Sequence, residues 1–236
     1  GNFPTLRCIE QIRNDCAYHN ANVKIVCVGG GFTYGPLGMS HHATEDIAVM
    51  RAMPDVTVFA PGDAAEAAAC TKAMYETPGT CYLRLGRGGE PKIHENAVDF
   101  TVGKAIEIRQ GKRVALFSTG AVYEEVAGAA KMLENAGIPP AVYTFPSVKP
   151  IANALIKKCA AEFELITTVE EHNIVGGFGS AVAEVMATVP CKARLALIGL
   201  EDKYSSTVGS QKYLREIYGM SAEKIFERIS EEIGIK

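Results

Sequence analysis

The sequence predicts an α/β fold of two domains, each built on a parallel sheet. Short apolar runs alternate with amphipathic stretches along the whole chain of 236 residues. These runs are rich in β-branched residues and nearly continuous in hydrophobicity, which is typical of strands covered on both faces. Residues 86–100 are polar, glycine-rich and without periodicity, so they are predicted to form a linker or an edge segment between two α/β series.

The first series alternates helix and strand three times. Helical spacing covers residues 6–19, 45–53 and 64–76, and the apolar runs cover residues 23–30, 56–61 and 80–85. No strand precedes the first helix, and three strands are few for an open α/β sheet. We therefore expect the first domain, residues 1–90, to be incomplete, with an exposed face that needs another chain or segment.

The second series forms a predicted domain at residues 102–236. Its expected strands are residues 104–109, 113–119, 141–146, 164–170 and 193–200, and its expected helices are residues 122–137, 151–162, 179–189 and 222–234. Strands that alternate with helices in this way form parallel sheets joined by right-handed crossovers.

Composition argues against several classes of partner. The formal net charge is -3 and no basic stripe is present, so nucleic acid is not an expected partner. No apolar run approaches the roughly 20 residues that span a bilayer, and no secretory leader is visible, so no membrane association is expected. The seven cysteines are scattered without a CxxC pair, which predicts reduced, mostly buried thiols in a cytoplasmic protein.

The histidine pair His41 and His42 lies in a glycine-rich loop after the first predicted strand. Ligands of open α/β sheets bind at the carboxyl ends of the strands, so this loop is a candidate site, although a solvated loop is an equally open interpretation. Adjacent histidines point apart and rarely bind one metal ion, so no metal site is predicted here. Glu45 and Asp46 fall in the next helical turn, where acidic groups favour the helix dipole by ~0.3–1 kcal/mol.

Two further segments carry polar groups at the ends of predicted strands. Arg84 and Arg87 end one strand, where they suit a phosphate or carboxylate ligand or lie exposed to solvent. Another strand ends in Glu170, Glu171 and His172, followed by a glycine-rich turn into a helix. The spacing of that turn does not fit a dinucleotide-binding fingerprint, and a plain strand-to-helix turn with an anion-friendly helix start remains open.

Three segments of the sequence are similar to those of a known enzyme family. "GGFTYGPLGMSHHATEDIAVMRAMPDVTVFAPGDAAEA" resembles the pyrimidine-binding segment of transketolases and 1-deoxyxylulose-5-phosphate synthases, and "YLRLGRG" resembles the arginine strand that follows it. "VEEHNIVGGFGSAVAEV" looks like the signature of their carboxy-terminal domain. The chain is therefore identified as a carboxy-terminal section of the thiamine-diphosphate transketolase family, and the resemblance implies a truncated pyrimidine-binding domain followed by a transketolase carboxy-terminal domain.

The resemblance implies roles for six side chains. His41 matches a catalytic histidine that contacts the donor, and Phe3 matches an aromatic residue that stacks on the cofactor. Arg7, Arg84 and Arg87 match positions at or near the sugar phosphate, and His42 is grouped with them as a substrate-binding residue, with support of the loop as its other possible role. Leu37 and Gly29 stand where the family has an aspartate and a histidine that contact the sugar, so the resemblance does not extend to those two contacts.

The resemblance also implies partners. The glutamate that activates the cofactor and the site for its diphosphate and Mg²⁺ or Ca²⁺ would lie in a separate amino-terminal section, and the assembly would be a homo-oligomer, expected to be a dimer. The expected activity is transfer of a two-carbon ketol unit between phosphorylated sugars. The alternatives are a 1-deoxyxylulose-5-phosphate synthase, a 2-oxoacid dehydrogenase β-type subunit, or a dimerisation scaffold without catalysis.

Overall fold

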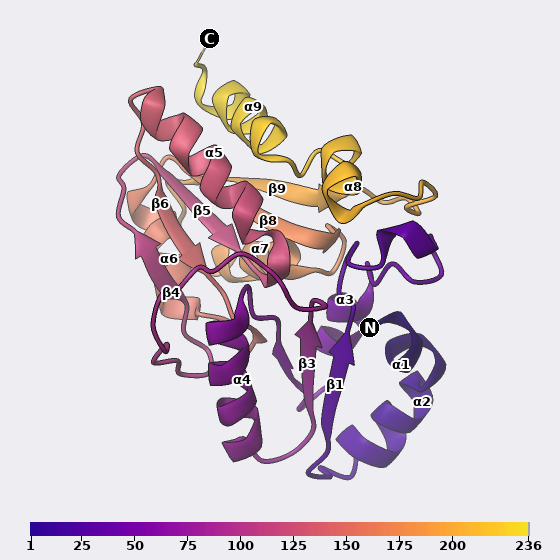
Figure 1. The fold of residues 1–236 in the computed structure, drawn as a ribbon. Coiled ribbons are helices and arrows are strands. Elements are labelled where there is room, and N and C mark those ends of the chain that lie inside the picture. Colours follow the sequence, from indigo (N-terminus) through magenta and orange to yellow (C-terminus); the bar gives the residue numbers. More distant parts are fainter. Residues whose placement is uncertain (236) are drawn as a thin grey trace.

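A computed structural model describes residues 1–235 and contains two mostly parallel sheets (Figure 1). The first sheet has the order β1-β3-β2-β7, in which β1, β3 and β2 are parallel and β7 is antiparallel to β2. Its strands are β1 (Lys24–Val28), β2 (Thr57–Phe59), β3 (Cys81–Leu85) and β7 (Ser147–Lys149). β1 is therefore an edge strand.

The second sheet has the order β4-β6-β5-β8-β9, and only β4 runs antiparallel to its neighbour. Its strands are β4 (Ile106–Arg109), β5 (Val114–Ser118), β6 (Ala141–Thr144), β8 (Leu165–Asn173) and β9 (Arg194–Leu200). The predicted α/β class with two sheets is confirmed, but each sheet contains one antiparallel strand: the predicted strand β4 in the second sheet and the unpredicted β7 in the first.

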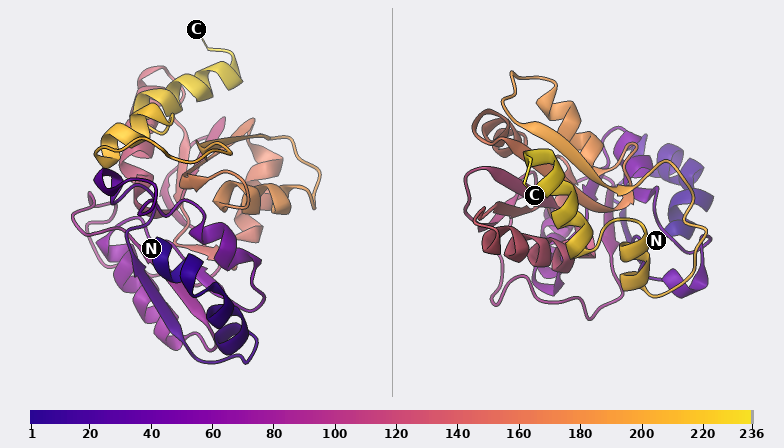
Figure 2. Two further views of the ribbon diagram at one scale, coloured as in Figure 1. Left: turned by 90° about the vertical axis from the view of Figure 1, so that its right-hand side faces the viewer. Right: turned by 90° about the horizontal axis from the view of Figure 1, so that it is seen from above.

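The helices pack on the faces of these sheets (Figures 1 and 2). The α-helices are α1 (Asn2–Arg7), α2 (Ile9–Gln11), α3 (Asp46–Ala52), α4 (Ala64–Glu76), α5 (Tyr123–Asn135), α6 (Asn153–Glu162), α7 (Phe178–Met186), α8 (Gln211–Ile217) and α9 (Ala222–Ile233). A π-helical segment, η1 (Ile12–Ala17), extends α2, and two 3₁₀ turns, η2 (Gly35–Leu37) and η3 (Gly120–Val122), precede α3 and α5.

Alternation along β5 divides the second domain into two apolar layers. Val114 and Leu116 pack against α5 and α9, whereas Ala115 and Phe117 belong to the core on the side of α6 and α7. The core on the side of α6 and α7 also contains Tyr82 of β3 and side chains of α3, so this core is shared by both sheets. A separate small core lies between α4 and the other face of β3. The two sheets are therefore joined through one continuous apolar layer.

Strand β7 links the halves in a way that the sequence did not predict. Its residues come from the second predicted domain, yet the strand pairs with β2 of the first sheet. The residues 86–100 contain no helix or strand, as predicted, and the backbone N–H groups of Ile93 and His94 donate to the Oδ2 of Asp63 at 2.7 and 3.0 Å. The segment is thus fastened to the start of α4.

Several boundaries differ from those predicted. The first helix begins at Asn2 and breaks at Cys8, ahead of the predicted start at residue 6, and α8 was not predicted. The remaining predicted helices and strands form within a few residues of their expected bounds. In residues 1–235, all seven cysteines are free, and four of them are buried, as expected for mostly buried thiols. No helix in that range has the length and apolar character needed to cross a membrane.

Candidate active site

The loop from residue 29 to 43 leaves the carboxyl end of β1 and returns to its own base. Gly31 and Ala43 exchange two backbone hydrogen bonds of 3.0 Å, which close the loop before α3 begins. Between these bonds, η2 and a turn in which His41 N–H donates to the Gly38 carbonyl at 2.9 Å fix the backbone on which both histidines lie. The loop is therefore a defined structure, not a mobile excursion of the chain.

His41 and Phe3 meet on an exposed face of the molecule. Their rings pack edge to face with centroids 5.3 Å apart, and the Phe3 side chain is 50% exposed. The Nδ1 of His41 lies 3.1 Å from the Ser40 hydroxyl, and within residues 1–235 its Nε2 has no hydrogen-bond partner. The structure thus brings together the two residues for which the sequence predicted catalysis and cofactor binding.

His42 points the opposite way and is buried. Its Nε2 lies 3.1 Å from the Gly35 carbonyl and its Nδ1 lies 2.6 Å from the Ser205 hydroxyl. A carbonyl can only accept, so Nε2 carries the proton and Nδ1 accepts from Ser205. With both ring nitrogens occupied and 1% of the residue exposed, His42 is not placed to bind substrate as was expected for it, and it supports the loop instead.

Arg84 also differs from its expected role. It is 4% exposed, so it is neither a solvated surface residue nor accessible to a sugar phosphate. Its Nε donates to the Oδ2 of Asp46 at 2.9 Å, and its Nη2 donates to the carbonyls of Ala43 and Glu171, both at 2.9 Å. Because Ala43 closes the histidine loop and Glu171 lies on β8, one guanidinium joins the loop to the second domain.

The glycines of the loop permit this approach of the arginine. A Cβ on Gly30 would lie 2.7 Å from the Nε of Arg84, and a Cβ on Gly31 would lie 2.7 Å from the Glu171 carbonyl oxygen. Gly31 also has a φ of +61°, which side chains other than glycine rarely adopt. The space that these glycines leave is therefore filled by the protein itself.

Asp46 has hydrogen-bonding partners in addition to the favourable helix dipole that was expected from the sequence. Its Oδ2 accepts from the Tyr82 hydroxyl at 2.7 Å as well as from Arg84, while its Oδ1 has no hydrogen-bond partner among the described residues and lies 3.9 Å from the Nε2 of His172. A buried arginine in the apolar run "CYLRL" was the sequence signal for this pair, because a charge inside a two-sided strand needs a buried partner.

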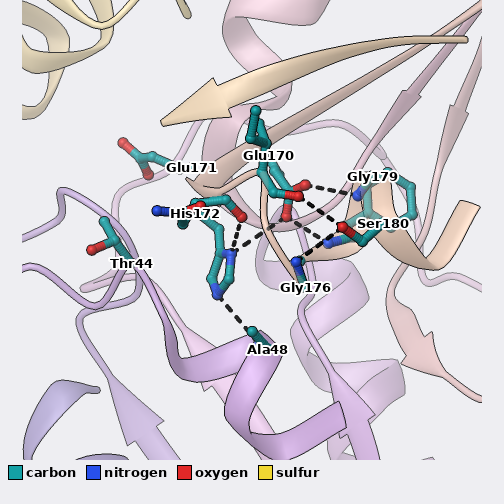
Figure 3. Close-up of polar contacts among 12 residues, drawn as sticks. Thr44, Ala48, Glu170, Glu171, His172, Gly176, Gly179 and Ser180 are labelled. Carbon is teal, nitrogen blue, oxygen red and sulfur yellow. Dashed lines mark hydrogen bonds and ion pairs between the residues drawn. The ribbon is translucent and has the colours of Figure 1, made fainter. Parts of the chain in front are cut away.

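Residues Glu170 and His172 face the helix starts between the two domains (Figure 3). The carboxylate of Glu170 accepts from the backbone N–H groups of Phe178 and Gly179 at 2.6 and 2.7 Å, at the start of α7. The Nε2 of His172 accepts from Ala48 N–H at 3.3 Å, near the start of α3, and its Nδ1 lies 2.6 Å from the Asn173 carbonyl. His172 is therefore neutral, with its proton on Nδ1.

Burial shifts the pKa values of both Glu170 and His172. Loss of hydration raises the pKa of Glu170 to about 7, although its two backbone hydrogen bonds favour the charged form. The same loss of hydration lowers the pKa of His172 to about 4, against the attraction of Asp46. Glu171 points away from this pair (Figure 3), and its carboxylate accepts from Arg215 at 3.1 Å and from Gln211 at 2.8 and 3.1 Å.

Arg7 and Arg87 are both exposed, as a role in binding substrate would require. Arg7 ends α1, a few residues after Phe3. Arg87 lines a pocket of about 320 Å³ at the carboxyl ends of β1 and β3 and the start of α4, together with Val28, Gly62 and Asp63. Within residues 1–235, no group of three or more His, Cys, Asp or Glu side chains could hold a metal ion.

Family models match both halves of the chain. Residues 1–91 match the pyrimidine binding domain of transketolase, and residues 103–225 match the transketolase C-terminal domain.

Individual relatives cover nearly the whole chain. It is 33% identical to one subunit of the apulose-4-phosphate transketolase of Actinobacillus succinogenes, over 95% of this chain and 72% of that protein. It is 33% identical to 1-deoxy-D-xylulose-5-phosphate synthase of Chlorobium luteolum, over 95% of this chain but 36% of that protein. A solved structure described as a split gene transketolase in an inactive β4 tetramer superposes with a TM-score of 0.89 at 35% identity, covering 99% of this chain and 74% of that one.

Replacing Arg84 with methionine tests the buried ion pair. Arg84→Met leaves the buried Asp46 carboxylate without its ion-pair partner and removes a hydrogen-bond donor to two carbonyls, so the free energy of unfolding should fall by about 3–5 kcal/mol. Arg113→Met is the matched control, because Arg113 forms an ion pair with Glu164 in which both side chains are nearly half exposed, and it should change little. Urea denaturation of the chain measures both, and equal small losses would contradict the role of Arg84.

Replacing Glu170 with glutamine tests its shifted titration. The pKa of Glu170 is 4.5 as its ordinary value and about 7 in the folded protein. Between these two pH values the folded state binds more protons at Glu170 than the unfolded state does, so the contribution of Glu170 to stability falls as pH rises through this window. Glu170→Gln removes that titration. We therefore expect the Tm of the variant minus that of the unaltered protein to increase from about pH 5 to about pH 8, whatever the offset from the changed hydrogen bonds.

The matched control for this experiment is Glu76→Gln, at an exposed position of α4. His172 titrates in the opposite sense but is present in every protein compared, so its own slope cancels in the differences. A difference in Tm that is flat with pH for Glu170→Gln as well would mean that Glu170 is ionised in the folded protein throughout this range.

Proposed function

The chain belongs to the transketolase family, and from this premise we propose that it is the section of a thiamine-diphosphate enzyme that transfers a two-carbon ketol unit between phosphorylated sugars. Membership of the family implies dependence on thiamine diphosphate. The observation that carries the proposal is the contact between His41 and Phe3, which come from the loop after β1 and from α1 and meet on one exposed face.

The residues on this face suit the organic part of the cofactor. Phe3 offers an exposed aromatic ring for stacking on the aminopyrimidine, and the edge contact with His41 fixes the angle of that ring. When bound, the cofactor supplies the nucleophilic carbon that carries the two-carbon unit. The free Nε2 of His41 would then give a proton to, or take one from, the oxygen atoms of the transferred unit, while Ser40 holds its Nδ1.

A metal-diphosphate site does not fit within residues 1–235, where no suitable group of ligands exists. We therefore assign the Mg²⁺ or Ca²⁺ and the diphosphate to a companion amino-terminal section. Exposed apolar side chains on α1, α2, the edge strand β1 and the histidine loop support a partner on this side; they are Phe3, Leu6, Ile9, Val26, Val28, Leu37 and Met39. The solved relative described as a tetramer supports assembly into an oligomer.

Arg87 is the candidate for the substrate phosphate. It is exposed beside the pocket at the strand ends, where a guanidinium can form paired hydrogen bonds to phosphate oxygens. Arg7 is a second candidate from α1. Arg84 is left out of this role, because its position inside the protein commits it to Asp46 and two carbonyls.

A 1-deoxyxylulose-5-phosphate synthase is the second candidate function. Leu37 favours it, because this side chain is 58% exposed on the histidine loop and offers no hydrogen bond to a sugar hydroxyl. The similarity to the enzyme of Chlorobium luteolum points the same way. Assays of the assembled enzyme with a ketose phosphate donor and with pyruvate separate the two functions by the product formed.

The first kinetic prediction concerns His41. In the enzyme assembled from this chain and its companion section, His41→Ala should lower kcat by about 10²-fold or more, because it removes a group that transfers protons in the reaction. His19→Ala is the control, since His19 is an exposed histidine that lies after η1, away from the loop. Steady-state kinetics with circular dichroism as a folding check decide the matter, and equal small losses would exclude His41 from the chemistry.

The second kinetic prediction concerns Arg87. Arg87→Met should raise KM for a phosphorylated sugar by roughly 10- to 100-fold, as expected for loss of a charge-assisted hydrogen bond of about 1.5–3 kcal/mol. The same variant should show little change with a donor that lacks phosphate. A similar KM for phosphorylated substrates in the variant and the unaltered enzyme would mean that Arg87 is a solvent-exposed residue without a role in binding the phosphate.

A further inference from the structure

A segment of the second domain lies against the histidine loop of the first. This strap, residues 201–218, follows β9, runs through an irregular stretch and ends in α8 (Figure 1). It meets the loop of residues 29–43 at the right of that view, although the contacting residues His42 and Ser205 are 163 positions apart in the chain. Three contacts, each of a different kind, join them.

The first contact is the hydrogen bond from the Ser205 hydroxyl to the Nδ1 of His42, at 2.6 Å. Both residues are 1% exposed, so water cannot replace this bond. The Nε2 of His42 donates to the carbonyl of Gly35, which begins η2 midway along the loop. The imidazole therefore bridges the strap and η2, and removing the Ser205 hydroxyl would leave a buried acceptor without a partner.

The second contact is a close backbone approach. A Cβ on Gly35 would lie 2.4 Å from the Gly209 carbonyl oxygen and 2.7 Å from the Cδ1 of Leu214. Only glycine leaves room for the strap at this distance. The third contact is aromatic: the fully buried Phe32 stacks on Tyr218 with ring centroids 5.4 Å apart. Phe32 also packs edge to face against the imidazole of His42, with ring centroids 5.5 Å apart.

We propose that the strap sets the position of His41, and that Ser205 and His42 are positioning residues for the proposed reaction. The inference rests on the proposed function of His41. Successive side chains of this turn point to opposite sides, so fixing the imidazole of His42 inside the protein fixes the backbone from which His41 reaches the exposed face. The second domain thereby contributes to the site without touching substrate.

Ser205→Ala tests the strap, and the adjacent Ser206→Ala is its matched control, because Ser206 is exposed and its side chain makes no hydrogen bond within residues 1–235. The first measurement is hydrogen exchange of the loop amides in this chain alone. We expect exchange in residues 33–43 to become roughly tenfold faster in Ser205→Ala, because a buried hydrogen bond is lost, and to stay unchanged in Ser206→Ala. Unchanged exchange rates in both variants would contradict the proposal that the strap holds the loop.

The second measurement is kinetics of the assembled enzyme. Ser205→Ala should lower kcat roughly tenfold while KM changes by less than about twofold, since His41 is misplaced but the phosphate contact is kept. Ser205→Thr, which keeps the hydroxyl, should restore most of kcat, and Ser205→Cys, a weaker donor, should fall between. Faster exchange with an unchanged kcat would overturn the positioning role.

A double-mutant cycle and the exchange data separate the two proposals. Losses in kcat from Ser205→Ala and His42→Ala should be clearly less than additive if both act through one hydrogen bond, and additive losses would contradict that link. If the unaltered assembled enzyme shows no ketol transfer, the proposed function falls. The exchange result then still decides whether the strap holds the loop: a faster rate in Ser205→Ala supports it and an unchanged rate overturns it.

Discussion

The ion pair between Arg84 and Asp46 is the constraint on which the arrangement of the candidate site depends. Both side chains are almost completely buried, so each charge loses its hydration and is stable only with hydrogen-bonding partners in place. Asp46 begins α3, and Arg84 also holds the carbonyls of Ala43 and Glu171. The base of the histidine loop, the start of α3 and strand β8 of the second domain must therefore keep fixed relative positions, or a buried charge is left unpaired.

A second buried ion pair, between Arg215 and Glu171 at 3.1 Å, lies next to the first, and Glu170 and His172 are the other buried titratable groups beside it. His172 is held neutral by burial and by the hydrogen bonds of its two nitrogens, although it lies near Asp46. Glu170 has a pKa raised to about 7, so the folded protein can relieve its negative charge near neutral pH. The boundary between the domains thus combines two buried ion pairs, Arg84–Asp46 and Arg215–Glu171, with Glu170 and His172 at two helix starts, and the apolar layer shared by both sheets supplies further contact area. The second domain thus fixes the base of the histidine loop, while His41 and Phe3 stay in contact on an exposed face.

Local patterns in the sequence were enough for most of the fold. Helix α4 has its predicted bounds, because Asp63 caps it and its apolar spacing is regular, and the strands that run through the core are apolar on both faces. Strand β7 and helix α8 were not predicted. In the case of β7, the strand has only three residues and forms because β2 lies beside it. In the site, resemblance predicted that Phe3 and His41 belong together. The arginine inside the apolar run "CYLRL" indicates a buried charge but not its partner, because Asp46 is 38 residues distant in the sequence, and no local pattern indicates that His42 bonds to Ser205, 163 residues distant.

The central claim is that this chain supplies one half of a shared site: the loop, the aromatic ring and the histidine, but not the metal and diphosphate ligands. Titrating the companion section into this chain, with thiamine diphosphate and Mg²⁺ present, tests that claim most directly through the rate of ketol transfer. We predict no transfer by either section alone and a rate that rises to a plateau when the two are present in equal numbers. Transfer by this chain alone at the plateau rate, or none at any ratio, would contradict the account.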